Sequence, residues 1–170
     1  MKHTIAVLVE NKPGVLFRVS GLFARRGFNI HSLAVGTTEN PKVSRMTIVV
    51  DLPERPLEHV TKQLYKLINV LKVIELEPGD SIEREMMLIK VRATSDTRAQ
   101  IIELVEVFRA KIVDVGNEAM AIEVTGSPEK IQAFETLIDS YGIVEMVKTG
   151  RIGLTRGAKG IADRTLKVAG

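Results

Sequence analysis

The stretch Glu10–Ile30, which reads ENKPGVLFRVSGLFARRGFNI, joins the end of an apolar strand-like segment to a polar turn, an amphipathic helix and the start of a second strand. Pro13 suits the first position of a helix, because its missing N–H costs nothing there and its fixed φ is already helical. Gly27 suits the position just after a helix, where a left-handed residue ends it. We therefore predict a helix from Pro13 to about Arg26. Its apolar residues fall on one helical face: Val15, Leu16, Val19, Leu22 and Phe23.

The turn before this helix is a candidate anion site. The backbone N–H groups of Gly14, Val15 and Leu16 would have no acceptor within the helix and would lie at the positive end of its dipole. Asn11 precedes the helix and Asn29 follows it, so their two amide side chains could flank one pocket. The same residue types also make an ordinary strand-to-helix turn, and the spacing alone favours that simpler interpretation.

The composition limits the classes of function. The chain has 170 residues, 45% of them hydrophobic, enough for one ordinary domain or two small ones. It has no Cys, which excludes disulfides, thiolate zinc sites, iron–sulfur clusters and cysteine nucleophiles. The histidines His3, His31 and His59 are far apart, so we expect surface residues and no metal site. No apolar run approaches the ~20 residues of a membrane span and no signal peptide is visible, so we expect a cytoplasmic protein that binds no membrane.

The excess positive charge is concentrated at the C-terminal end. The net charge is +3, and Arg151–Gly170 contain five basic side chains and one acidic side chain, which leaves −1 for residues 1–150. Such a tail is either a solvated terminus or a contact for an acidic surface, and the sequence leaves both open. RNA-recognition folds stack bases on strand aromatics, whereas residues 44–52 contain none, so we expect no nucleic-acid partner.

The first half of the chain has the order strand, helix, strand, strand, helix, strand. Hydrophobic alternation predicts the strands at residues 3–10, 28–37, 44–52 and 70–76. Pro53 and Pro56 introduce the second helix. The apolar residues of that helix are at helical spacing: Leu57, Val60, Leu64, Leu67 and Ile68.

The second half repeats this order after a linker-like break at residues 78–81. Strands are predicted at residues 85–93, 111–115, 119–125 and 143–149. Ser95 or Asp96 would cap the third helix, and Ser127 followed by Pro128 would begin the fourth. The inward residues of these two helices are expected to be Ile101, Leu104, Val105, Phe108, Ile131, Phe134, Leu137 and Ile138.

The predicted fold class is α+β, with two tandem ferredoxin-like βαββαβ units that each carry helices on one face of an antiparallel sheet. The domains would be residues 1–77, a linker at 78–83, a second unit at 84–150 and a basic tail at 151–170.

The second strand of such a unit, here 28–37, lies at a sheet edge. Exposed apolar edges aggregate unless something pairs with them, which favours a homodimer that continues the sheet. Asn11 and Gly14 of one subunit could then meet Asn29 and Ile30 of the other.

One enzyme hypothesis remains as the alternative. The motif at Gly14–Arg18 resembles the phosphate-binding turn of acylphosphatases, which have the same order of elements. The strand that should supply their catalytic asparagine ends as Ala34-Val35-Gly36-Thr37 and lacks it. No metalloprotease, P-loop, dinucleotide-binding or nucleophile-elbow motif is present. We therefore predict no catalytic residues.

A set of motifs, in order along the chain, resembles the ACT domain, and more narrowly the small regulatory subunits of acetolactate synthase, also called acetohydroxyacid synthase. The motifs are ENxPGVLxRV at 10–19, LFARRGFNIxSL at 22–33, SRMTIVV at 44–50, KQLxKLxxV at 62–70, EREMMLIKV at 83–91, FRAKIVDV at 108–115 and GxxGLTRG at 150–157. The resemblance covers about residues 1–157, and the tail beyond them matches less clearly.

This resemblance implies a non-catalytic subunit that activates a separate catalytic large subunit in branched-chain amino-acid biosynthesis. The partner would use thiamine diphosphate, Mg²⁺ and FAD, and this chain would hold no cofactor. The first unit, as an ACT domain, would bind a branched-chain amino acid, usually valine, and transmit feedback inhibition, while the second unit would contact the partner. The implied effector-binding residues between two ACT domains are Asn11, Gly14, Val15 and Leu16 on one side and Asn29 and Ile30 on the other.

Overall fold

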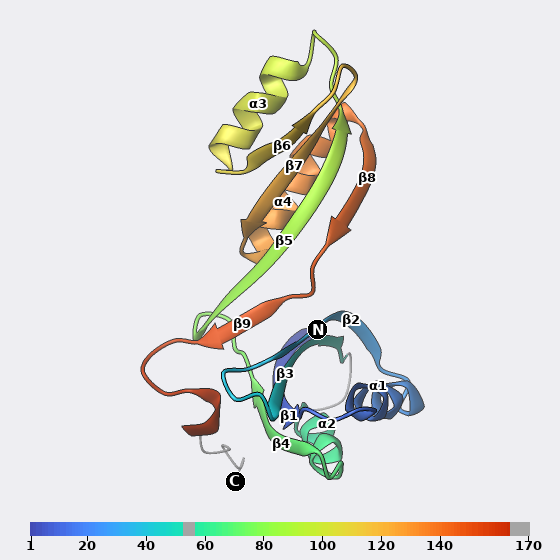
Figure 1. The fold of residues 1–170 in the computed structure, drawn as a ribbon, viewed down its shortest axis with the longest axis vertical. Helices are drawn as coiled ribbons and strands as arrows, with labels where there is room; N and C mark the ends of the chain where they lie inside the picture. The colour runs from blue at the N-terminus through green and yellow to red at the C-terminus, as the bar shows by residue number, and fades with distance from the viewer. Residues whose placement is uncertain (53–56, 164–170) are drawn as a thin grey trace. The chain divides into compact units, whose positions relative to one another are not determined.

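The computed structural model describes residues 1–52 and 57–163, and Figure 1 shows its fold. The chain forms two compact units. Unit 1 contains Met1–Ile82 and the segment from Gly150 onward, and unit 2 contains Glu83–Thr149. Both units have the βαββαβ order, so the predicted α+β class and its internal repeat are confirmed. The predicted roles of Pro53 and Pro56 lie outside the described residues.

Unit 1 is a four-stranded antiparallel sheet with two helices on one face (Figure 1). Its elements are β1 (Lys2–Glu10), α1 (Val15–Arg25), β2 (Asn29–Thr37), β3 (Val43–Asp51), α2 (Leu57–Tyr65) and β4 (Val70–Glu75). The strand order is β2-β3-β1-β4, so β2 lies at a sheet edge as predicted.

The core of unit 1 lies between the sheet and these helices. Ile5, Val7 and Val9 alternate along β1 and are at most 1% exposed, as expected for one face of a strand. They pack in one cluster with Val19 and Phe23 of α1. Burying each such side chain stabilises the fold by about 1.5–3 kcal/mol relative to leaving it exposed.

Unit 2 repeats this arrangement with different side chains. Its elements are β5 (Ser81–Arg92), α3 (Arg98–Val107), β6 (Lys111–Val115), β7 (Ala119–Gly126), α4 (Pro128–Ile138), a 3₁₀ turn η1 (Asp139–Tyr141) and β8 (Ile143–Lys148). The strand order is β6-β7-β5-β8. Met87, Ile89 and Val91 of β5 form the core with Ile101 of α3 and Phe134 of α4.

The segment that follows unit 2 along the chain belongs to unit 1. It contains a short strand, β9 (Ile152–Thr155), and a 3₁₀ turn, η2 (Ile161–Asp163). Strand β9 pairs with β5, which already begins at Ser81, inside the stretch expected as a linker. Residues 151–163, expected as part of a basic tail, are therefore integrated into the fold.

Several helix boundaries differ from the sequence prediction. Pro13 lies before α1, because Gly14 takes the N-cap position with a left-handed φ of 83° and the helix begins only at Val15. Helix α2 ends at Tyr65, and Ile68 lies in the following turn with 84% of its side chain exposed. The helical period therefore stops before Ile68 is reached.

In unit 2 the start of α4 was predicted correctly and the start of α3 was predicted wrongly. Ser127 caps α4, where its Oγ accepts a hydrogen bond of 3.2 Å from the Lys130 N–H, and Pro128 is the first helical residue, as predicted. Neither Ser95 nor Asp96 caps α3, which begins after Thr97. Leu137 was expected to face inward, but it is 49% exposed because the buried stripe of α4 runs through Ile131, Phe134 and Ile138.

Candidate functional site

The turn between β1 and α1 has a backbone shape that differs from the predicted helix start at Pro13. Gly14 has a φ of 83°, which L side chains rarely adopt, and a Cβ there would meet nothing within 4 Å. The position therefore requires glycine for its backbone conformation and not for lack of space. The Val15 N–H lies 3.5 Å from the Lys12 carbonyl, and the first N–H groups of α1 have no acceptor within the helix. The turn is open and carries donors.

Asn11 is fixed in this turn by two hydrogen bonds. Its backbone N–H donates to the Lys42 carbonyl at 2.8 Å, and its Nδ2 donates to the Pro41 carbonyl at 2.9 Å. Because Nδ2 is used in this way, Oδ1 remains as the acceptor of that side chain. The loop before β3 therefore orients Asn11 as a hydrogen-bond acceptor beside the start of α1. No pattern in the sequence indicated the contact with Pro41.

Leu16 adds apolar surface to the same end of the unit. It is 42% exposed, while Val15 beside it is only 4% exposed and belongs to the core. The predicted site residue Leu16 can therefore offer its side chain, whereas the Val15 side chain is buried and its N–H already donates to the Lys12 carbonyl. Glu10 lies next to the turn and pairs with Lys12 at 2.6 Å, so the adjoining charges are already matched.

Asn29 and Ile30, the other predicted site residues, lie at the opposite end of the sheet. Asn29 begins β2 and pairs with Asp51, whereas Glu10 pairs with Val43 at the far end of β3. Eight residues of strand separate the two ends, which corresponds to about 25 Å. The two groups therefore cannot form one pocket within a single chain. Asn29 is exposed, and Ile30 is half-buried against the core.

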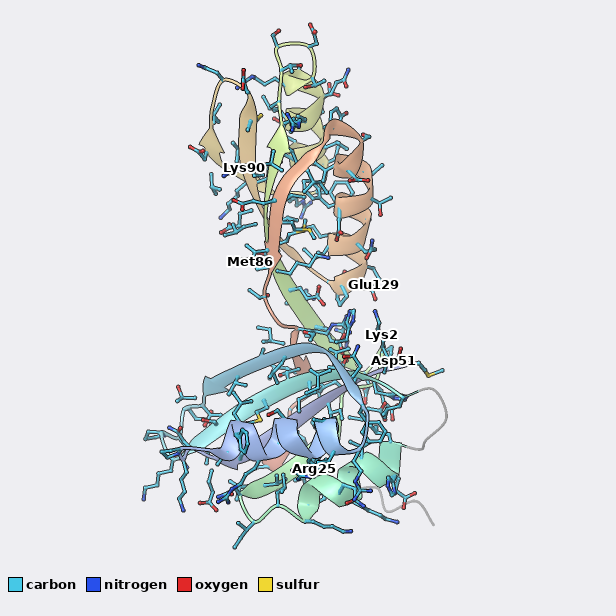
Figure 2. All side chains as sticks on the ribbon, turned by 90° about the vertical axis from the view of Figure 1, so that its right-hand side faces the viewer. Lys2, Arg25, Asp51, Met86, Lys90 and Glu129 are labelled. Carbon is cyan, nitrogen blue, oxygen red and sulfur yellow. The ribbon has the colours of Figure 1, made fainter. Side chains whose placement is uncertain are left out.

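The sheet end near Asn29 has two features that the sequence did not reveal. The register of β2 shifts between Ile30 and Ser32, so His31 is the extra residue of a β-bulge, a device common beside functional sites. Asp51 accepts a hydrogen bond of 2.9 Å from the N-terminal ammonium, which lowers the pKa of Asp51 below its usual value, and Lys2 adds to the effect. Figure 2 shows Lys2 and Asp51 close together there.

The acylphosphatase hypothesis receives no support from this geometry. Arg18, the arginine of the resembling motif, donates to Oδ1 of the buried Asn69 at 2.8 Å. Its guanidinium therefore ties α1 to the turn before β4. Across the described residues, no three His, Asp or Glu side chains gather where they could hold a metal ion, and no described helix is long and apolar enough to span a membrane.

The histidines expected at the surface have local partners. His3 Nδ1 lies 2.7 Å from Glu75 Oε1, and His31 Nε2 lies 3.1 Å from Lys2 Nζ. His59 lies beside Arg26, with 3.4 Å between Nε2 and Nη1.

Both units match known family descriptions. Residues 5–72 match the "AHAS small subunit-like ACT domain", where AHAS stands for acetohydroxyacid synthase. Residues 84–157 match the "Small subunit of acetolactate synthase". Unit 1 is thus an ACT domain.

Relatives and a solved structure match nearly the whole chain. It is 58% identical to the acetolactate synthase small subunit of Mycolicibacterium smegmatis over 159 residues, which is 94% of each chain. It is 56% identical to a probable acetolactate synthase small subunit of Archaeoglobus fulgidus, over 94% of this chain and 99% of that one.

The crystal structure of the acetolactate synthase small subunit from Thermotoga maritima superimposes with a TM-score of 0.84 at 43% identity, and covers 94% of this chain and 99% of that chain. The match in sequence and in fold extends over both units and the returning C-terminal segment. The chain therefore belongs to the family of acetolactate synthase small subunits, the regulatory and non-catalytic chains of that enzyme.

Proposed function

We propose that this chain forms a homodimer through its ACT domains and binds a branched-chain amino acid, with valine as the first candidate, between them. The effector would regulate a catalytic large subunit of acetolactate synthase by feedback inhibition. The observation that carries the proposal is that Asn11 and Asn29 lie at opposite ends of the sheet while β2 is its edge. A second copy is then needed to complete the site.

In a two-fold dimer, antiparallel pairing of the two β2 strands would bring the second half of the site from the partner. Two copies of β2 that pair in antiparallel fashion about a two-fold axis bring the start of each strand beside the end of the other. The end of β2 at Thr37 pairs with Ser44, next to Val43 and Glu10. The partner's Asn29 would thus approach Asn11 and Gly14 of this chain, and two equivalent sites would form.

The chemistry of these groups suits a free amino acid. The N–H groups at the start of α1 favour a carboxylate. Asn11 Oδ1 is available to accept from an ammonium, since Nδ2 already bonds to Pro41. The exposed Leu16 can contact an aliphatic side chain. One methylene changes affinity by only about 1–3 kcal/mol, so leucine and isoleucine should compete with valine at the same site.

The catalytic chemistry would belong to the partner. The large subunit would hold thiamine diphosphate, Mg²⁺ and FAD, and this chain would bind and activate it, with unit 2 as the contacting part. Acting from a regulatory chain, the effector can shift the enzyme's activity only by its differential affinity for two states of the complex. We place this assembly in the cytoplasm.

The test is isothermal titration calorimetry of the full chain with L-valine. Asn11→Ala should weaken binding about tenfold or more, because it removes a hydrogen bond to a charged group. Asn117→Ala is the matched control, since Asn117 is an exposed residue between β6 and β7. Unchanged valine affinity in Asn11→Ala, with the fold intact by circular dichroism, would contradict the proposed site.

A further inference from the structure

The helix-free face of the unit 1 sheet is buried although no helix covers it. Thr4, Ala6, Thr47 and Val49 alternate with the core residues of β1 and β3, so their side chains lie on that face. They are 5%, 0%, 3% and 0% exposed. The chain's own segment 150–156, hereafter the strap, contacts this face through Thr4 and Arg45, and Figure 1 shows its strand β9 on the side of the sheet away from α1 and α2.

Polar contacts fix the strap to three strands. The Arg151 N–H donates to Ser32 Oγ on β2 at 2.8 Å, and Arg151 Nη1 donates to Thr4 Oγ1 on β1 at 3.2 Å. Further along, Arg45 Nη2 on β3 donates to the Gly153 carbonyl at 2.7 Å. These contacts join residues more than one hundred positions apart in the sequence.

Gly150 allows the strap to approach β2 closely. A Cβ built on Gly150 would lie 2.2 Å from the Leu33 carbonyl oxygen and 2.8 Å from the Ala34 nitrogen. Both neighbours are backbone atoms of β2, which cannot move aside as a flexible side chain can. Any residue other than glycine would therefore push the strap off the strand.

The residue before the strap is fixed to unit 2. The Thr149 N–H donates to the Met86 carbonyl at 2.9 Å, and the Met86 N–H donates to Thr149 Oγ1 at 3.0 Å. Figure 2 labels Met86 on β5. Only Gly150 therefore separates a residue held by β5 of unit 2 from Arg151, which is held by β1 and β2 of unit 1.

We propose that the strap is the coupling element of this subunit, and that Arg151 is the positioning residue that links β2 of the ACT domain, through Thr149, to unit 2. The inference rests on the proposed function, because it takes the effector site to include Asn29 and Ile30. Ser32, which accepts from Arg151, is two residues beyond Ile30 and directly follows the bulge at His31.

The strap could exchange between two states, one docked on the sheet of unit 1 and one released from it. Its attachment to β1, β2 and β3 consists of a few hydrogen bonds and one close approach, in addition to the pairing of β9 with β5, so docked and released arrangements on the sheet of unit 1 can differ by a modest free energy. A ligand that orders the start of β2 favours whichever arrangement suits that form of the strand. By linkage, a change in the strap alters effector affinity by the same factor.

Hydrogen–deuterium exchange of the full chain tests this coupling directly. Saturating L-valine should change the exchange rate of the peptide covering residues 150–156 about fivefold or more, at the lower end of typical allosteric coupling. The peptide covering β7 is the control and should not change. A strap peptide that is indifferent to valine, while the β2 peptide responds, would overturn the proposal.

Two variants test the same link by inhibition of the complex with the catalytic subunit. Ser32→Ala removes the acceptor for the Arg151 N–H but none of the proposed effector contacts, and Gly150→Ala displaces the strap sterically. Activation without valine should persist in Ser32→Ala, while its maximal inhibition by saturating valine should fall about fivefold. Ser20→Ala is the matched control, because the Ser20 hydroxyl donates to the Phe17 carbonyl within α1.

The outcomes separate this inference from the proposed function. If calorimetry detects no valine binding to the wild-type chain, the proposed effector site has failed. If valine binds and inhibits the Ser32→Ala complex as fully as the wild-type complex, the strap does not couple the two units and only the inference is overturned. Should Gly150→Ala fail to fold, Ser32→Ala and the exchange experiment still decide the question.

Discussion

The helix-free faces of the two sheets differ although the sheets have the same topology. In unit 1 this face carries small and polar residues such as Ala6 and Thr47, and both are buried. In unit 2 the corresponding face carries Leu88 and Val147, which are 45% and 62% exposed in the single chain. The helix-free face of unit 1, which carries the more polar residues, is thus the covered face. Small side chains let another segment approach the backbone closely, whereas side-chain polarity alone does not tell which face is covered.

The largest expected effect comes from placing a carboxylate at matched positions of the two faces. Ala6→Glu puts a charge under the strap, where the wild-type side chain is 0% exposed. Burying an unpaired charge, or releasing the strap to avoid it, should lower the free energy of unfolding by about 3 kcal/mol or more. Leu88→Glu changes an exposed side chain and should cost about 1 kcal/mol or less.

Urea unfolding of both variants, followed by circular dichroism, measures this difference. Equal destabilisation by the two substitutions would show that the two faces are covered alike in solution. An additional readout is limited proteolysis after Arg151 and Arg156, which should accelerate in Ala6→Glu and stay at the wild-type rate in Leu88→Glu.

An intermediate loss of stability is expected when the cationic side chain on the helix-free face of each sheet is replaced. Arg45 is half-buried, and this burial lowers its pKa below the usual value, while its guanidinium donates to the Gly153 carbonyl of the strap. Lys90 of unit 2 pairs at 3.3 Å with Glu145, which is 74% exposed. Arg45→Met should cost about 1–2 kcal/mol, since a charged hydrogen bond is lost but a desolvated charge is also removed. Lys90→Met should cost about 0–1 kcal/mol.

Urea unfolding at low and high salt compares the variants Arg45→Met and Lys90→Met. Added salt should reduce the small effect of Lys90→Met and leave that of Arg45→Met nearly unchanged, because buried charges are screened much less. If Arg45→Met were neutral, the strap would not depend on this contact.

Local patterns were sufficient to predict most of the fold. Alternation of Ile5, Val7 and Val9 identified β1 and its core face, and Ser127 followed by Pro128 identified the start of α4. The errors lie where tertiary contacts outweigh a local signal. Pro13 was predicted as the first helical residue, but Gly14 takes the N-cap position and the helix begins at Val15, because the turn has a positive φ just before the helix.

The docking of the strap on unit 1 had no signature in the sequence, although its residues form the motif at 150–157. Gly150, Arg151 and Gly153 resemble a basic, flexible terminus, and the hydrogen bonds of the strap are made with residues 108 to 147 positions away. The residues of the candidate site could be predicted from the sequence, but their positions relative to one another could not. The turn at Asn11 and Gly14 was visible, but only the strand register reveals that Asn29 lies at the other end of the sheet.

The smallest expected effect concerns an exposed ion pair of unit 1, which tests the effect of charge apart from that of burial. The hydrogen bond from the N-terminal ammonium lowers the pKa of Asp51, although the Asp51 side chain is 52% exposed. A carboxyl group whose pKa is lowered by folding stabilises the fold above its unfolded-state pKa, and this contribution disappears as the pH falls through the folded-state pKa. Asp51→Asn should therefore be slightly less stable than the wild type near pH 7, and this difference should be smaller near pH 2, because the contribution begins to disappear once the pH falls below the ordinary carboxyl pKa of about 4.

Urea titrations at the two pH values provide the measurement. If the stability difference between the wild type and Asp51→Asn grew as the pH fell, folding would not lower the pKa of Asp51. A difference near pH 7 as large as that caused by Arg45→Met would mean that exposed charges stabilise unit 1 as strongly as the contacts of the strap do. The expected ranking is Ala6→Glu, then Arg45→Met, then Asp51→Asn, and it follows burial because water screens the exposed pair and is excluded beneath the strap.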